Sequence, residues 1–328
     1  MLDLPSIASP QLWAISIAVL LGLLAVDFVL TRRPHAVAMR EAVGWSLFYL
    51  ALPGAFGALI WQVYGHRPAV EFYTGYVVEK SLSVDNLFVF MLLLAAFAVP
   101  PQLAQRVLLY GIAGALVLRA IFIAAGAVVL QSGAWAFLLF GGVLLLTAAK
   151  VFREAVRHDE YQVEIEQMRS VRLLKRLMPV TSDYRGGKLT VRADGRRALT
   201  PLALVVVAVF MTDLVFAVDS VPAVYGVTED PYLVFATNAF ALLGLRALYF
   251  VLHNVLDRLR HLNYGLAIIL AFIGVKLVLH WAHGLWAGVP DIPTDASLVV
   301  IAVTLAAVTA TSLYADRRER ATTGVTPR

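Results

Sequence analysis

Nine stretches of about 20 mostly apolar residues constrain this chain more than any other feature. The hydrocarbon core of a bilayer is about 30 Å thick, and a helix needs about 20 apolar residues to cross it. The 328 residues are 60% hydrophobic and only 15% charged, whereas a soluble domain carries roughly 25% charged residues. We therefore predict a single all-α polytopic transmembrane domain over residues 1–328, with spans near 11–30, 42–61, 72–99, 107–130, 134–150, 200–225, 231–252, 263–281 and 296–314.

The distribution of Lys and Arg predicts the orientation. With the N-terminus outside and the C-terminus inside, 22 of the 27 basic residues fall in inner segments, whereas Arg67 alone falls in an outer one. This is the bias expected of cytoplasmic segments, so the net charge of +5 reflects topology and does not indicate nucleic-acid binding. The outer segments instead carry acids, which could form an exit vestibule for cations: Asp3, Glu71, Glu229, Asp230, Asp291 and Asp295.

The one long connection, residues 151–199, is predicted to be a cytoplasmic loop. Its first half favours helix, and its second half is typical of a short hairpin that turns at Asp194-Gly195. Its basic residues are interpreted as a topogenic signal, with contact to acidic lipid or a regulatory role as the alternative. The chain has no Cys, which excludes disulfides and thiolate metal sites.

An internal repeat relates the third to fifth spans to the sixth to eighth. Each copy carries, in order, an acid pair with a following polar residue, then an arginine, then a lysine: Glu79, Asp85, Asn86, Arg119 and Lys150 in the first, and Asp213, Asp219, Ser220, Arg246 and Lys276 in the second. Because each copy contains three spans, the second enters the membrane from the opposite face. Such inverted repeats are typical of secondary transporters, which bind substrate near the bilayer midplane at the repeat interface.

Charged residues in the middle of these spans point to a functional site, because each costs about 2.5–3.5 kcal/mol to insert. The predicted metal ligands are Glu79, Asp85, Asn86, Asp213, Asp219 and Ser220, and the predicted supporting residues are Lys80, Arg119, Asn238, Arg246 and Lys276. Asp27 and Lys150 lie near inner span ends, where an interfacial position would explain them. A ligand set of carboxylate, amide and hydroxyl oxygens favours Mn²⁺, Mg²⁺ or Ca²⁺.

The spacing within each motif sets its geometry. Two acids six residues apart lie about 9 Å apart along a helix and about 120° apart around it. One straight helix therefore cannot present both to one ion, unless Ser81, Ser83 or Pro222 permits local unwinding. Antiparallel alignment of the two motifs predicts instead that Asp85 meets Asp213 and that Glu79 meets Asp219. The competing interpretation is an internal salt-bridge network in which the intramembrane bases neutralise the acids.

Four segments resemble the TerC family of integral membrane proteins, named for tellurite resistance, and its Alx-like branch. The segments are 79–90, 187–201, 212–224 and 237–250, and recognisable pattern extends over roughly residues 70–280. The resemblance implies a bacterial-type inner-membrane protein associated with manganese export or homeostasis, and in some members with tellurium resistance. It assigns metal handling to Glu79, Asp85, Asp213 and Asp219.

The leading hypothesis is therefore a Mn²⁺ exporter that works by alternating access, with possible exchange for protons, no prosthetic group and no enzymatic activity. Its expected partners are a divalent cation and the lipid bilayer, with no nucleic acid, and the sequence does not identify any protein partner. An intramembrane di-aspartyl protease is disfavoured, because neither motif carries a Gly-x-Gly-Asp signature. Two further alternatives remain: a membrane partner that supplies metal to or stabilises metalloproteins, and a tellurium-resistance component without transport activity.

Overall fold

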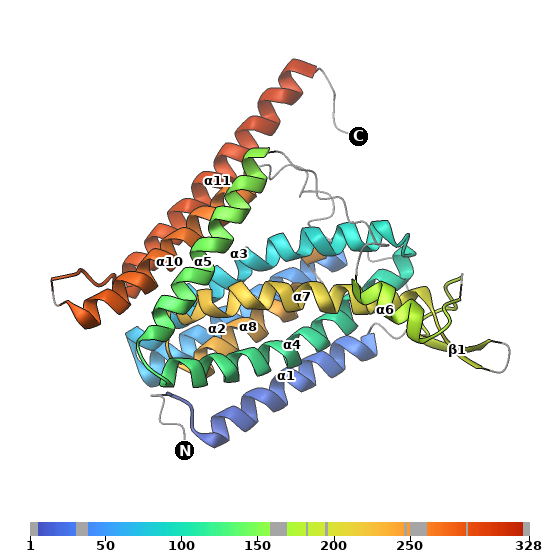
Figure 1. Cartoon of the computed structure of the whole chain (residues 1–328), viewed down its shortest axis with the longest axis horizontal. Helices are drawn as coiled ribbons and strands as arrows, with labels where there is room; N and C mark the ends of the chain where they lie inside the picture. Colours follow the sequence, from blue (N-terminus) through green and yellow to red (C-terminus); the bar gives the residue numbers. More distant parts are fainter. Residues whose placement is uncertain are drawn as a thin grey trace.

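The computed structural model describes residues 6–30, 39–157, 169–181, 183–193, 196–245, 248–249, 261–286 and 288–323, which form helices and one small hairpin (Figure 1). The helices are α1 (Pro10–Leu30), α2 (Met39–Tyr64), α3 (His66–Ala96), α4 (Pro101–Gln131), α5 (Trp135–Arg157), α6 (Arg169–Leu177), α7 (Pro201–Tyr225), α8 (Pro231–Leu243), α10 (Leu262–Leu285) and α11 (Thr294–Thr323). The strands are β1 (Thr190–Ala193) and β2 (Arg196–Leu199). The predicted all-α class is confirmed.

Proline begins helices α4, α7 and α8, as it also begins α1. Pro101, Pro201 and Pro231 occupy the first turns of α4, α7 and α8, where the missing N–H costs nothing and the fixed φ angle favours the helix. Asp230 caps α8, because its side chain accepts a 2.8 Å hydrogen bond from the backbone N–H of Tyr232. These local signals fix where α4, α7 and α8 start.

Seven helices within the described residues are long and apolar enough to cross a membrane: α1, α2, α4, α5, α7, α10 and α11. They correspond to seven of the nine predicted spans, and the protein is an integral, multi-pass membrane protein. The predicted span 72–99 is helix α3, which has 31 residues but carries Glu79, Lys80 and Asp85 in its middle. The predicted span 231–252 begins as the short helix α8, and its continuation includes residues that lie outside the described ones. A total of nine therefore stays a prediction.

Each helix of the first predicted repeat packs against a helix of the second. Helix α3 packs against α8, α4 packs against α7, and α5 packs against α10. In Figure 1, α5, α10 and α11 lie together and cross the remaining helices at an angle. In the predicted repeat, α3, α4 and α5 correspond to α7, α8 and α10, respectively. Exchanging each helix for its counterpart turns the α3–α8 contact into the α4–α7 contact and leaves the α5–α10 contact unchanged. The packing thus has the pairs that the predicted inverted repeat requires, and the repeat itself stays a prediction.

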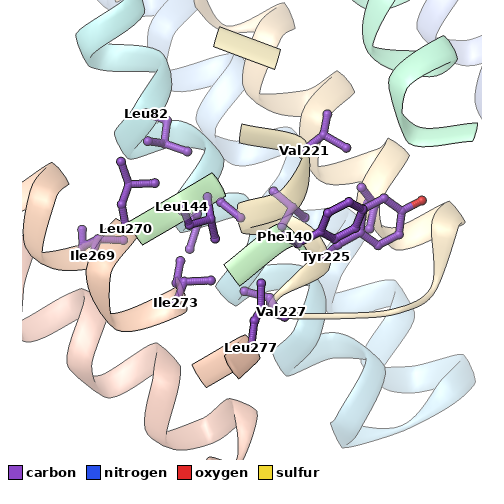
Figure 2. Packing of buried hydrophobic residues seen from close by; sticks show 14 of the residues in the cluster. Leu82, Phe140, Leu144, Val221, Tyr225, Val227, Ile269, Leu270, Ile273 and Leu277 are labelled. Carbon is purple, nitrogen blue, oxygen red and sulfur yellow. The ribbon is translucent and has the colours of Figure 1, made fainter. Parts of the chain in front are cut away.

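Apolar residues from α3, α5, α7 and α10 form a large part of the core (Figure 2). Phe140 of α5 and Tyr225 of α7 lie with ring centroids 6.1 Å apart. Helices α5 and α10 approach each other closely at two glycines: a methyl group on Gly141 would lie 2.9 Å from the backbone oxygen of Gly274. Small residues at such crossings allow helix backbones to pack closely within a membrane.

Large apolar side chains also cover the outside of the bundle. Leu21, Leu47, Leu146 and Val215 are each at least 60% exposed. The helices that carry them, α1, α2, α5 and α7, have few charged residues, so their outer surfaces are mostly apolar. Scattered exposed apolar residues are normal in soluble proteins, but a continuous apolar exterior over several helices is the surface that lipid chains solvate.

The long connection has the two parts that its sequence predicts. Helix α5 continues to Arg157, and α6 spans Arg169–Leu177. Strands β1 and β2 then pair antiparallel, with Thr190 opposite Leu199 and Arg192 opposite Arg197. The predicted turn residues Asp194 and Gly195 lie outside the described residues. The hairpin is at the opposite end of the bundle from the connection between α10 and α11 (Figure 1).

Candidate functional site

A buried arginine joins four helices in the interior of the bundle. Arg119 of α4 is only 1% exposed. Its Nη1 atom donates hydrogen bonds to Glu79 Oε1 of α3 and, at 2.7 Å, to Asn238 Oδ1 of α8. Its Nη2 atom donates to Asp213 Oδ1 of α7 at 3.3 Å. One guanidinium thus gathers residues from α3, α7 and α8, which are far apart in the sequence.

Among the described side chains that contact Arg119, the charges do not cancel. Glu79 and Asp213 each form an ion pair with the same guanidinium, and their side chains are 0% and 1% exposed. Two ionised carboxylates and one guanidinium leave a formal charge of −1. An uncompensated charge is costly where water is excluded. The cluster is therefore an environment that favours a further cation or a proton.

Several polar atoms on α3 and α7, the helices that carry Glu79 and Asp213, are buried without a hydrogen-bond partner in the described part of the chain. They include the second carboxylate oxygens, Glu79 Oε2 and Asp213 Oδ2, the hydroxyls of Ser83 and Ser220, and Asn86 Nδ2. Most buried polar groups in proteins are paired. An amide can rotate to present its oxygen in place of its nitrogen, so all five side chains can offer oxygen to a ligand.

Helical spacing explains why these groups share a face. Glu79, Ser83 and Asn86 are four and then three residues apart on α3, and Asp213 and Ser220 are seven apart on α7. Residues at these spacings line one side of a helix. Both helices are continuous through the motifs, so the unwinding proposed at Ser81, Ser83 or Pro222 is not observed. Ser83 was not predicted as a site residue, although its position four residues after Glu79 could have identified it.

The predicted pairing of Glu79 with Asp219 stays a prediction. Glu79 and Asp213 meet at the same guanidinium, because Arg119 reaches both with its two terminal nitrogens. Asp219 lies six residues further along α7 and is partly exposed, whereas its neighbour Ser220 is buried. The side chain of Asp85 lies outside the described residues, so its predicted contact with Asp213 stays a prediction.

The predicted supporting bases have different positions. Among the described side chains, only Arg119 forms an ion pair with a motif acid. Lys80 instead donates to the backbone oxygen of Ala241 at 3.4 Å, because residues 79 and 80 face about 100° apart on α3. Lys276 lines the outer cavity described below, and Arg246 lies outside the described residues. The described basic residues therefore do not form a salt-bridge network that neutralises every motif acid.

The two charges interpreted as interfacial differ from each other. Lys150 is 68% exposed and lies 3.8 Å from Glu154 on the same helix, as expected for a lysine that reaches the membrane surface. Asp27 is only 3% exposed and accepts a 3.3 Å hydrogen bond from the Tyr49 hydroxyl. Asp27 is therefore buried within the protein whereas Lys150 is exposed, and an interfacial depth for Asp27 stays a prediction.

The described side chains do not form a ready-made metal centre. Among them, no three acidic or histidine residues are gathered closely enough to hold a metal ion. Glu79 and Asp213 are both bound by Arg119, so a metal ion at these carboxylates would compete with the guanidinium.

A cavity of about 650 Å³ opens at the predicted outer end of α3, α7 and α10. Its lining includes five of the six acids predicted to form a vestibule: Glu71, Glu229, Asp230, Asp291 and Asp295. The sixth, Asp3, lies outside the described residues. Arg67 and Lys276 are the lining bases, so the formal charge of the lining is −3 with histidines neutral.

Hydrogen bonds hold the acidic lining in place. Glu71 Oε2 accepts from the Thr228 hydroxyl at 2.7 Å. His280 lies between two acids, with Nδ1 3.2 Å from Asp291 Oδ1 and Nε2 3.8 Å from Glu229 Oε1. These contacts tie α3, α10 and the connections at the outer end around one acidic cavity.

Comparison with known proteins gives a consistent result. Residues 64–320 match the integral membrane protein TerC family. An uncharacterized membrane protein of Myxococcus xanthus is 39% identical over 314 residues, which is 95% of each chain. One from Mycobacterium tuberculosis is 41% identical over 320 residues, which is 94% of this chain and 81% of the relative. Alx of Escherichia coli K12, whose name proposes a membrane-bound redox modulator, is 40% identical over 84% of this chain and 87% of its own. No solved structure matches the chain.

Proposed function

We propose that this chain, which belongs to the TerC family of integral membrane proteins, exports a divalent metal cation across a bacterial-type inner membrane, with Mn²⁺ as the preferred cargo. The observation that carries the proposal is the buried cluster at Arg119, where two carboxylates share one guanidinium and several oxygen-bearing groups lack partners. Hard divalent cations prefer such oxygens. The choice of Mn²⁺ over Mg²⁺ or Ca²⁺ rests on the family resemblance.

Arg119 acts in this proposal as a resident counter-ion. Without cargo, its guanidinium neutralises part of the charge of Glu79 and Asp213 and keeps the helices together. A divalent cation that reaches these carboxylates displaces one or both of the guanidinium contacts. When the cation leaves, Arg119 re-forms them, so the empty site does not hold two unpaired buried charges. This competition weakens cargo binding, and weaker binding favours release.

The acidic cavity at the predicted outer end supplies the exit. Its net negative lining attracts cations over a range set by salt screening, about 8–10 Å at physiological ionic strength. Binding of protons to the site carboxylates as metal leaves would couple export to proton entry, and the dependence of flux on an imposed pH gradient tests this part.

Flux measurements on purified protein test the proposal. We expect Mn²⁺ uptake into dye-loaded proteoliposomes to fall at least tenfold in Glu79→Gln and in Asp213→Asn, because each removes a buried carboxylate. The matched control is Glu154→Gln, which neutralises a partly exposed carboxylate of α5 that pairs with Lys150 and forms no ion pair with Arg119. Competition with Mg²⁺ and Ca²⁺ in the same assay defines the cargo. Wild-type flux in both site variants, once each is shown to be folded, contradicts the proposal.

The same assay separates transport from the alternative functions. A protein that only supplies metal to a partner, or that acts in tellurium resistance without transport, gives no wild-type flux above empty liposomes. The redox role in the name of Alx cannot come from thiols here, because this chain has no Cys. Under the proposal, an effect on cellular redox state would follow from the metal that is moved.

A further inference from the structure

A second charged cavity lies at the opposite, inner end of the molecule, on the β1–β2 hairpin and the turn before it. Its volume is about 570 Å³. Four of its six lining residues are basic, namely Arg185, Lys188, Arg192 and Arg197, and no acid is among the described residues that line it. It shares no residue with the Arg119 cluster.

Two of these arginines face each other across the hairpin. Arg192 of β1 and Arg197 of β2 are direct partners in the antiparallel register, so their side chains lie on the same face of the two strands. Like charges in directly opposite positions destabilise a hairpin. An anion bound between them would reverse the sign of that interaction.

The other two cations are brought together by a tight turn. The backbone N–H of Lys188 donates to the backbone oxygen of Arg185 at 3.4 Å, and Gly186 between them has a φ of +58°, which glycine adopts without strain. In the described part of the chain, none of the four basic side chains forms a hydrogen bond or an ion pair with another residue. Their positive charge is therefore available to a ligand.

The hairpin is fixed to the membrane helices. The hydroxyl of Thr200, directly before α7, donates to the Lys188 backbone oxygen at 2.7 Å. The Tyr184 hydroxyl donates to the backbone oxygen of Phe97, directly after α3, at 2.8 Å. A methyl group on Gly187 would overlap the guanidinium of Arg106 from α4. The cations are thus held beside the inner ends of α3, α4 and α7.

We propose that this basic pocket, defined by Arg185, Lys188, Arg192 and Arg197, binds a phosphate-bearing anion. Guanidinium groups match the geometry of phosphate oxygens and bind them with paired hydrogen bonds. The position beside the inner ends of α3 and of the membrane helices α4 and α7 favours the headgroup of an anionic phospholipid of the inner leaflet as the source. A free phosphate compound is the other source of the same chemistry. This proposal does not depend on metal export.

The test compares two pairs of substitutions in the full-length protein. Arg192→Gln with Arg197→Gln removes the facing arginines, and Arg153→Gln with Arg157→Gln removes two exposed charges at the inner end of α5 outside the pocket. One arm measures retention of cardiolipin and phosphatidylglycerol against phosphatidylcholine by native mass spectrometry. The other arm measures binding of inorganic phosphate and pyrophosphate by calorimetry. A hydrogen bond to a charged group contributes at least about tenfold to binding, so we expect roughly 100-fold weaker binding in the pocket pair and a clearly smaller loss in the control pair.

Each outcome decides the proposal. Selective loss of anionic lipid in the pocket pair supports a lipid site, and selective loss of phosphate or pyrophosphate supports a site for a free phosphate compound. Equal loss in both pairs shows a general charge effect and overturns the pocket. Unchanged binding in the pocket pair in both arms, or no binding by the wild type, also overturns it. Thermal unfolding of both pairs confirms that the comparison is made between folded proteins.

Discussion

Removal of the Arg119 side-chain charge is the most direct test of how the bundle interior is held together. In Arg119→Met, Glu79 and Asp213 lose their common cation, and Asn238 loses a 2.7 Å hydrogen bond. Breaking a buried ion pair from one side costs about 3–5 kcal/mol, because a charge is left buried without a partner. Here two carboxylates are affected, and protonation of one of them limits the total. We expect the free energy of unfolding to fall by about 3–5 kcal/mol.

The assay is reversible unfolding by SDS in mixed micelles, followed by tryptophan fluorescence. Arg67→Met is the matched control, because Arg67 also pairs with a glutamate but its side chain is 90% exposed. Exposed pairs contribute at most about 1 kcal/mol. The expected loss should shrink by at least half when Glu79→Gln and Asp213→Asn are added to Arg119→Met, since the buried charges are then removed.

Two results would refute this reasoning. The first is an Arg119→Met protein within about 1 kcal/mol of the wild type, a loss that an exposed pair alone could give. The second is a deeper loss when both carboxylates are neutralised, because charge would then not be the source of the instability. Either result would also remove the physical basis for Arg119 as a resident counter-ion.

Two further predictions concern packing and the hairpin. Gly141→Val should cost about 1–3 kcal/mol of unfolding free energy through overpacking, because its side chain would meet the Gly274 backbone, whereas Gly142→Val has nothing within 4 Å; equal losses would contradict the close approach. Tyr184→Phe removes the hydrogen bond to Phe97, worth about 1 kcal/mol, and should speed hydrogen exchange in the hairpin. Burial raises the pKa of Tyr184, so its stabilisation is complete below the ordinary tyrosine pKa and is lost as pH rises through the raised value. Exchange in the wild type should therefore approach that of the variant only at strongly alkaline pH.

Much of the fold could be predicted from the sequence, because membrane insertion depends on local composition. A helix that satisfies its own backbone and carries about 20 apolar residues is favourable in lipid wherever it lies in the chain. Seven predicted spans are confirmed as helices of sufficient length and apolarity. The hairpin could also be predicted, since turn residues and strand propensity act over a few positions. Helix α3 is where composition is least informative, because Glu79, Lys80 and Asp85 interrupt its apolar stretch.

The sequence predicted which residues belong to the site, but not how they pair. Glu79, Arg119, Asp213 and Asn238 were identified from the sequence as intramembrane polar residues, and the structure brings them together. That Glu79 and Asp213 share one guanidinium could not be predicted, because motif spacing gives no information on the relative heights of two helices. The burial of Asp27 was also missed, since it depends on where α2 lies against α1.

The sequence by itself determined the membrane class, the likeness to a family and the set of charges placed among apolar residues, because each of these depends on residues that are near one another in the chain. Only the tertiary structure decided that Arg119 would hold Glu79 and Asp213 at once, and that four basic residues would surround one inner cavity. Those arrangements depend on how whole helices and strands pack, which is set by side-chain shape and charge over the full bundle.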